Sequence, residues 1–240
     1  MSLLGVERVG KSFRGLRAVD DVSFEVAERE IVALIGPNGA GKTTIFNLIA
    51  GAIPPDTGTV TLGGQTLNGL RPDQSCRAGI GRTFQIVRPF GQMNVRDNVI
   101  VGALRALPTV AEARRAADEV LALLELEPLA ERLAASLTLP ERKRLEVARA
   151  LATRPRLLLL DEVMAGLRPT EVDRMVATLR ALNRDTGLTI LLIEHVMRAV
   201  MALADRVVVL HHGQLIAAGT PAEVTRHPKV IESYLGEAAV

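Results

Sequence analysis

Hydrophobic and polar positions divide the chain into regions with different periods. In residues 1–35, short apolar runs alternate with charged turns, which predicts strands over residues 6–9, 19–26 and 31–35. Apolar stretches bounded by glycine and proline turns predict further strands over residues 59–62 and 79–85. We therefore expect an antiparallel sheet at the start of the chain, leading into a glycine-rich loop.

The period changes to that of helices from about residue 88 to residue 154. Residues 94–107 are one candidate helix, and residues 111–126 combine an apolar face with charge pairs four positions apart. After residue 154, strands and helices alternate. Strands are predicted over residues 157–160, 188–193, 206–210 and 214–218, helices over residues 170–185 and 196–204, and short helices within residues 221–235.

This pattern predicts an α/β fold with a mostly parallel core sheet and an N-terminal antiparallel β subdomain. Residues 1–240 would form a single domain. A helical subdomain, about residues 88–154, would be inserted between the two parts of the core, residues 1–87 and 155–240.

Composition and charge exclude several classes of function. The chain has 240 residues, a net charge of +2 and 2% aromatic residues, so we expect no nucleic-acid partner. The single cysteine, Cys76, excludes an intrachain disulfide. Four charged residues interrupt the most apolar region, residues 188–209, and this argues against direct membrane insertion. Any role at a membrane would therefore go through a partner.

The glycine-rich loop after residue 35 fits the pattern G-x-x-x-x-G-K-[ST]. Glycines let backbone N–H groups approach phosphate oxygens, and the helix predicted after the loop presents the positive end of its dipole. A chance turn that contains a lysine is the alternative, and the flanking strand and helix argue against it. We predict that a nucleotide's phosphates bind Gly36, Pro37, Asn38, Gly39, Ala40, Gly41, Lys42, Thr43 and Thr44. Lys42 would neutralise the outer phosphates, and the Thr43 hydroxyl would ligate Mg²⁺.

Two acidic residues, Asp161 and Glu162, follow the four leucines at positions 157–160. An acid at the end of a buried parallel strand can hold Mg²⁺ near Thr43, which is the role we predict for Asp161. Glu162 is then placed to activate a water molecule as general base. A solvated acidic turn is the common alternative, and the phosphate-binding loop in the same chain favours the nucleotide site.

These motifs resemble those of the ATP-binding-cassette (ABC) ATPases over essentially the whole chain. The resemblance implies that Phe13 stacks on adenine and that Gln85 senses Mg²⁺ and the γ-phosphate. It also implies that His195 contacts the γ-phosphate and that residues 165–167 cross the interface of an ATPase dimer. Without the resemblance, Phe13 would be a core residue, Gln85 a polar strand end and His195 the start of a helix.

The end of the chain, residues 219–237, is similar to the tail of ATPase subunits of branched-chain amino-acid importers. The resemblance implies ATP and Mg²⁺ as cofactors, with membrane permease subunits and a second ABC ATPase subunit as partners, in a heterodimer or a homodimer. The chain would be cytoplasmic and peripheral on the inner face of the cell membrane. Gln85 and residues 86–93 would pass the closing and reopening of the ATPase dimer to the permease.

One motif departs from the family pattern. Where the family has Leu-Ser-Gly-Gly-Gln, this chain has Leu-Thr-Leu-Pro-Glu at positions 137–141. Thr138 keeps a hydroxyl for the nucleotide of the partner, but Pro140 has no N–H to donate. The spacing of Thr138 and Glu141 also fits a capping box that begins a helix. Val163 and Arg168 depart from the family as well, and we hypothesise an asymmetric heterodimer in which this altered signature completes the weaker site.

The expected reaction is ATP hydrolysis by Lys42, Glu162 and His195, coupled to uptake of branched-chain amino acids. Three alternatives stay open. The chain could serve a transporter for urea or for lipid export, or it could be a regulatory subunit that binds nucleotide and hydrolyses it weakly. A cassette for DNA repair or ribosomes would usually carry a coiled-coil insertion or a second cassette, and residues 1–240 contain neither.

Overall fold

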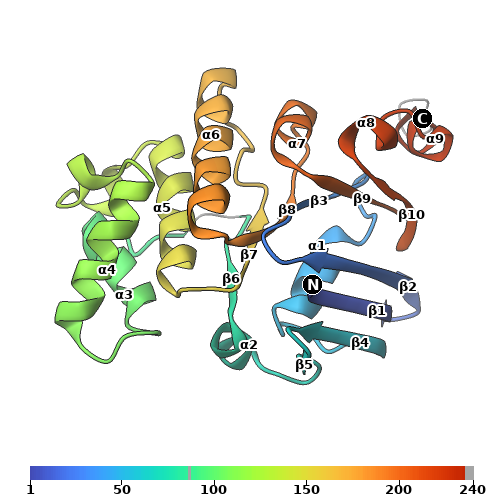
Figure 1. The fold of residues 1–240 in the computed structure, drawn as a ribbon, viewed down its shortest axis with the longest axis horizontal. Helices are drawn as coiled ribbons and strands as arrows, with labels where there is room; N and C mark the ends of the chain where they lie inside the picture. Colours follow the sequence, from blue (N-terminus) through green and yellow to red (C-terminus); the bar gives the residue numbers. More distant parts are fainter. Residues whose placement is uncertain (86–87, 236–240) are drawn as a thin grey trace.

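The computed structural model describes residues 1–85 and 88–235, which form two sheets and the helices around them (Figure 1). The smaller sheet has the order β2-β1-β4-β5 and is antiparallel throughout. Its long strands β1 and β2 form a hairpin, because the chain reverses at residues 14–15 between their ends. Its strands are β1 (Ser2–Phe13), β2 (Leu16–Ala27), β4 (Thr57–Leu62) and β5 (Gln65–Thr66).

The larger sheet has the order β10-β9-β3-β8-β7-β6. All its pairs are parallel except β9 with β10 at one edge. The carboxyl ends of β3, β7 and β8 therefore meet at one edge of the sheet, where open α/β sheets bind ligands. Its strands are β3 (Ile31–Ile35), β6 (Ile80–Arg82), β7 (Leu157–Asp161), β8 (Thr189–Ile193), β9 (Arg206–His211) and β10 (Gln214–Gly219).

The central strands are buried on both faces, which explains their continuous apolar sequences. Along β3, Ile31, Ala33 and Ile35 pack into a core that most of the helices share. The alternate residues Val32 and Leu34 pack into a second core with α1 and the antiparallel sheet. The large sheet thus lies between two cores, each built from one side of the central strands β3, β7, β8 and β9.

The helices fall into three groups. Helix α1 (Lys42–Ile49) follows the glycine-rich loop, and α2 (Pro72–Ala78) precedes β6. Helices α3, α4 and α5 stand together beyond β6 and β7, away from the antiparallel sheet (Figure 1). The third group, α6 to α9, follows the strands β7 to β10 along the chain. The helices after α2 are α3 (Val95–Ala103), α4 (Val110–Leu123), α5 (Leu139–Ala152), α6 (Pro169–Thr186), α7 (Met197–Leu203), α8 (Pro221–Val224) and α9 (Pro228–Leu235).

The expected α/β class, with its antiparallel sheet and mostly parallel core sheet, is confirmed. Two local expectations were wrong. Strand β3 pairs in parallel with β8 and β9, so it belongs to the core sheet and not to the N-terminal antiparallel one. The strand expected over residues 79–85 covers only β6, because Gly79 ends α2 with a left-handed backbone and the chain leaves the sheet after Arg82. The boundaries of the helical subdomain stay a prediction.

Candidate nucleotide site

The glycine-rich loop connects β3 to α1 and folds around its own lysine. The Lys42 Nζ atom donates hydrogen bonds to the carbonyl oxygens of Gly36, at 2.6 Å, and Pro37, at 2.8 Å. Only 6% of Lys42 is exposed, although it is the first residue of the helix. The ammonium is thus fixed inside the loop, at the point where the loop would surround a phosphate.

Two glycines of the loop are required for different reasons. Gly36 lies so close to the neighbouring strand that a Cβ atom would stand 2.1 Å from the carbonyl oxygen of Leu210. Gly39 has a φ of +77°, and a Cβ atom there would meet no atom within 4 Å. The first glycine therefore serves packing, whereas the open space beside the second leaves its backbone accessible to a ligand.

Asp161 ends β7 beside the loop. Its carboxylate is buried and lies 3.3 Å from Nη2 of Arg82, which also donates to Asn47 through Nη1 at 2.8 Å. Burial raises the pKa of Asp161, and the Arg82 guanidinium opposes this shift. Asp161, Thr43 and Gln85 line one cavity, so the structure brings together the three side chains predicted to hold a metal.

These three side chains fit a metal ion whose remaining coordination positions are filled by a bound nucleotide. A cluster of three His, Cys, Asp or Glu side chains able to hold a metal does not occur within residues 1–85 and 88–235. One carboxylate, one hydroxyl and one amide supply oxygen atoms, the donors that Mg²⁺ prefers, and phosphate oxygens usually complete its shell. The residues present therefore fit Mg²⁺ together with a nucleotide, and they do not form a metal site of their own.

The Glu162 carboxylate lies between two other predicted site residues, His195 and Gln85. Its Oε1 atom lies 2.8 Å from Nε2 of His195, and its Oε2 atom accepts a hydrogen bond of 2.9 Å from Nε2 of Gln85. The backbone of Glu162 is left-handed, with a φ of +50°. This conformation costs a residue with a side chain about 1–3 kcal/mol, and such residues cluster at functional sites.

Two buried charged residues lie near Glu162, and neither was predicted from the sequence. Lys143, on α5, donates from Nζ to the carbonyl oxygen of Glu162 at 2.8 Å. Glu194 follows β8 and accepts the N–H of Met164 at 2.8 Å, and burial raises its pKa to about 7. The signal that could have found Glu194 was an acid directly after an apolar strand. Lys143 is one of several basic residues on a charged helix, so the sequence pattern does not distinguish it from solvent-exposed lysines and arginines.

Phe13 and Thr138 lie away from this cluster. Phe13 ends β1 with 43% of its surface exposed, and the Lys11 ammonium lies 5.7 Å from the centre of its ring. Thr138 is the N-cap of α5, where the Glu141 carboxylate accepts its N–H at 2.7 Å. The predicted capping box is therefore present, with Pro140 in the first turn. The roles of Phe13 and Thr138 toward a nucleotide stay predictions.

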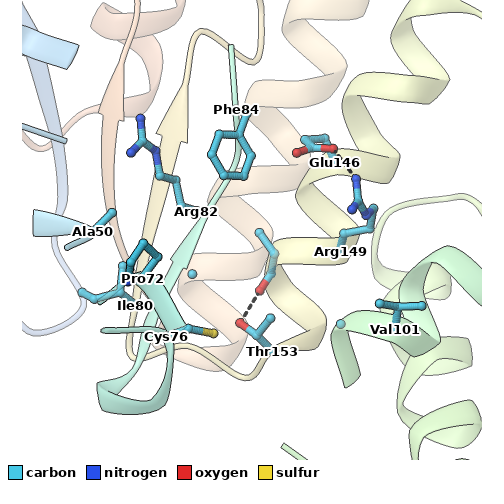
Figure 2. Close-up of a pocket in the computed structure, with 13 residues that line it drawn as sticks. Ala50, Pro72, Cys76, Ile80, Arg82, Phe84, Val101, Glu146, Arg149 and Thr153 are labelled. Atoms are coloured by element: carbon cyan, nitrogen blue, oxygen red, sulfur yellow. Dashed lines mark hydrogen bonds and ion pairs between the residues drawn. The ribbon is translucent and has the colours of Figure 1, made fainter. Parts of the chain in front are cut away.

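A second cavity shares Arg82, Phe84, Glu146 and Arg149 with the first, and Figure 2 shows the side chains that line it. It is enclosed by α2, β6, α3 and α5, and we call it the α3–α5 groove. Figure 2 shows Val101 and Cys76 near one end of the groove, and Glu146 hydrogen-bonded to Arg149 near the other. The Arg149 guanidinium also lies 4.8 Å from the centre of the Phe90 ring. Exposed apolar side chains, Phe84 and Val101 among them, line the groove.

A phosphate-binding loop after β3, carboxylates at the end of β7 and a histidine after β8 define a nucleotide-binding α/β protein of the cassette type. Residues 19–165 match the family model of the ABC transporter, and this chain belongs to that family of ATPases. Residues 214–240 match a second model, described as branched-chain amino acid ATP-binding cassette transporter. No helix among the described residues is both long and apolar enough to cross a membrane.

Relatives extend over nearly the whole chain. The high-affinity branched-chain amino acid transport ATP-binding protein LivG of Salmonella typhimurium is 44% identical, and BraF of Pseudomonas aeruginosa is 40% identical, with 98% of each chain covered. Among solved structures, the ABC transporter cassette MJ1267 superposes with a TM-score of 0.90 at 31% identity, covering 98% of this chain and 99% of that one. The dimeric cassette MJ0796, bound to ADP and Pi, superposes with a TM-score of 0.82 at 25% identity over 91% and 99% of the two chains.

Proposed function

We propose that this chain binds and hydrolyses ATP as a subunit of an importer that takes up branched-chain amino acids through membrane permease subunits. The observation that carries the ATPase is the position of Glu162, held between Gln85 and His195 at the edge of the sheet where the phosphate-binding loop lies. The similarity of residues 214–240 to the branched-chain amino acid cassette model supports the transported class.

Each predicted site residue has a chemical task in this reaction. Lys42 would exchange its two loop carbonyls for phosphate oxygens and neutralise their charge. Glu162 would accept a proton from the attacking water, and His195, hydrogen-bonded to the same carboxylate, would orient it and bind the γ-phosphate. Phe13, exposed at the end of β1, would stack on the adenine.

Mg²⁺, when bound with the nucleotide, would neutralise charge on the β- and γ-phosphates. Thr43, Gln85 and Asp161 would hold it, because they line one cavity. Asp161 is well suited to this task, since its buried carboxylate already lies beside one cation, the Arg82 guanidinium.

The chain would act as one half of an ATPase dimer, at the inner face of the membrane. Thr138 at the start of α5 would face the nucleotide of the second subunit, and Leu139 and Pro140 leave fewer backbone donors there than the family signature has. We therefore propose a heterodimer in which this signature completes the weaker of two sites. Inactivating each composite site separately tests this asymmetry, and equal losses of ATPase activity would reject it.

The permease would contact the α3–α5 groove and the segment that follows Gln85. The groove supports this role because its apolar side chains, such as Phe84 and Val101, are exposed. Of the predicted contact segment, residues 86–93, positions 86 and 87 lie outside the described residues, as do residues 236–237 of the similar tail. Residues 88–93 lead from the site into α3.

Reconstitution tests the proposal directly. The chain is co-expressed with a second cassette subunit and two permeases in vesicles, and uptake of leucine, isoleucine and valine is measured together with ATP hydrolysis. We expect uptake that requires ATP and is lost in the Glu162→Gln variant. Uptake of urea or movement of a lipid, in place of these amino acids, would reject the transported class. ATP binding without turnover in the complete complex would instead favour the regulatory alternative, which the altered signature motivates.

A further inference from the structure

Two oppositely charged side chains are buried together near Glu162. Lys143, from α5, is 5% exposed, and Glu194, after β8, is 2% exposed. Burying charges is unfavourable unless each finds a partner, so removing one member of such a pair leaves the other buried without compensation. Neither residue belongs to the phosphate-binding loop, and neither is needed to explain nucleotide binding.

The backbone of Glu162 is held from two sides. Its N–H donates to the carbonyl oxygen of Ile193, at 2.9 Å, which ties it to the end of β8. Its carbonyl oxygen accepts the Lys143 ammonium at 2.8 Å, which ties it to α5. The left-handed conformation of Glu162, with a φ of +50°, is unfavourable by itself and persists only where its surroundings impose it.

Glu194 holds the next part of the same loop. One carboxylate oxygen accepts the N–H of Met164 at 2.8 Å, and the second, Oε2, is buried without a hydrogen-bond partner among the described residues. The backbone N–H of His195 also stabilises the charged form of this carboxylate, and the positive charge of Lys143 adds an electrostatic attraction between the two side chains. Together they fix the residues on the C-terminal side of Glu162.

We propose that Lys143 and Glu194 are positioning residues for ATP hydrolysis, which impose the left-handed turn at Glu162 and so direct its carboxylate to Gln85 and His195. This inference rests on the proposed ATPase function. The same contact links α5, the helix capped by Thr138, to the general base Glu162 of its own subunit through the Lys143 ammonium. A displacement of α5 would therefore move the carbonyl of Glu162.

Steady-state ATPase kinetics of the reconstituted complex test the inference. Lys143→Met keeps the length of the side chain and removes the donor, so kcat should fall about 10- to 100-fold, with KM for ATP within about twofold of the wild type. Lys143→Arg restores a donor and should recover most of the lost kcat. Glu194→Ala should lower kcat in the same way, and Glu194→Gln should lower it less, because its amide oxygen can still accept the Met164 N–H.

The matched control is Thr189→Val, at the far end of β8. Thr189 is 2% exposed and accepts the Arg29 N–H at 2.9 Å, so this variant also loses a buried hydrogen bond on the same strand. We expect it to lower the thermal midpoint and leave kcat unchanged. The same equilibrium affinity for ATP in all variants, measured by calorimetry, would separate positioning from loss of the binding site.

Three results would overturn the inference. They are an unchanged kcat in Lys143→Met, a failure of Lys143→Arg to recover activity, and a loss of kcat in Thr189→Val that matches its loss of stability. If Lys143→Met does not fold, the comparison of Glu194→Gln with Glu194→Ala decides, and equal kcat values in these two variants would reject the positioning role. A wild-type complex without ATPase activity would reject the proposed function itself, whereas an active wild type with equally active variants would reject only the positioning role.

Discussion

Oε1 of Glu162 lies 2.8 Å from Nε2 of His195, although 33 positions separate them in the sequence. The register of the core sheet explains this proximity. Asp161 on β7 pairs with Ile193 on β8, so Glu162 and His195 follow neighbouring strand ends by one and two residues. A parallel sheet thus brings a candidate base and a candidate phosphate ligand together without any local sequence relationship between them.

Replacing Glu162 by Gln should separate binding from hydrolysis. The amide cannot accept the proton of water, so we expect ATPase activity to fall about 10²- to 10⁴-fold. The phosphate-binding loop is untouched, so the affinity for ATP should stay close to that of the wild type. Phosphate release and calorimetry on the same preparations measure both quantities, and turnover retained within tenfold would contradict the assignment of the base.

Gly36→Ala and Gly39→Ala should have different effects. At position 36 a methyl group would collide with the Leu210 carbonyl, so we expect an insoluble or strongly destabilised protein. At position 39 the methyl group enters open space, and only its left-handed backbone resists the change, by about 1 kcal/mol. Thermal unfolding should be nearly unchanged for Gly39→Ala while ATP affinity falls. Equal thermal stability of the two variants would contradict the close contact of Gly36 with the Leu210 carbonyl and the open space beside Gly39.

The stability of the protein should depend on pH through Glu194. Burial raises the pKa of this carboxyl from the ordinary 4.5 to about 7, so the folded chain keeps a proton that the unfolded chain has released. The free energy of unfolding should therefore fall as pH rises from about 4.5 to 7, by on the order of 3 kcal/mol. Glu194→Gln carries no titrating group and should lose this part of the slope in urea titrations at pH 5, 6, 7 and 8.

Some slope should remain in that variant. Burial also raises the pKa values of Asp161 and Glu146, and both act in the same direction. A Glu194→Gln protein whose stability changed with pH as steeply as that of the wild type would show that Glu194 ionises normally in the folded chain.

A charge in the α3–α5 groove should weaken association with the permease. Val101 lines the groove with 42% of its surface exposed, so aspartate there costs little folding energy but would be desolvated in a complex. We expect Val101→Asp to bind ATP as the wild type does and to be recovered with the permease at least about tenfold less. Val110→Asp, at a 63% exposed site outside the groove, is the control and should behave as the wild type.

The sequence predicted structure best where a single short segment contains all the residues of a motif. The phosphate-binding loop, the four leucines before Asp161 and the Thr138–Glu141 capping box are local patterns, and the structure has each where it was expected. The direction in which β3 pairs could not be predicted, because an apolar run is compatible with parallel and antiparallel neighbours.

Two kinds of feature were missed. Helix α2 has a proline in its first turn and Gly79 after its end, which are ordinary boundary signals, but its polar residues show no apolar period. Lys143 and Glu194 were missed for a different reason. Charged residues are mostly solvated, so a buried pair becomes visible only when α5 and β8 have been placed against the same loop.

The bonds that Lys42 makes inside its own loop also bear on which nucleotides the chain can select. An entering phosphate must compete with two carbonyl oxygens for the ammonium, and only oxygens on a polyphosphate long enough to reach it can do so. Adenosine and AMP would leave these bonds intact and gain only the contacts of the base, the ribose and, for AMP, one phosphate. Lys42 would thus favour binding of nucleotides with a long phosphate chain over binding of short ones, before hydrolysis begins.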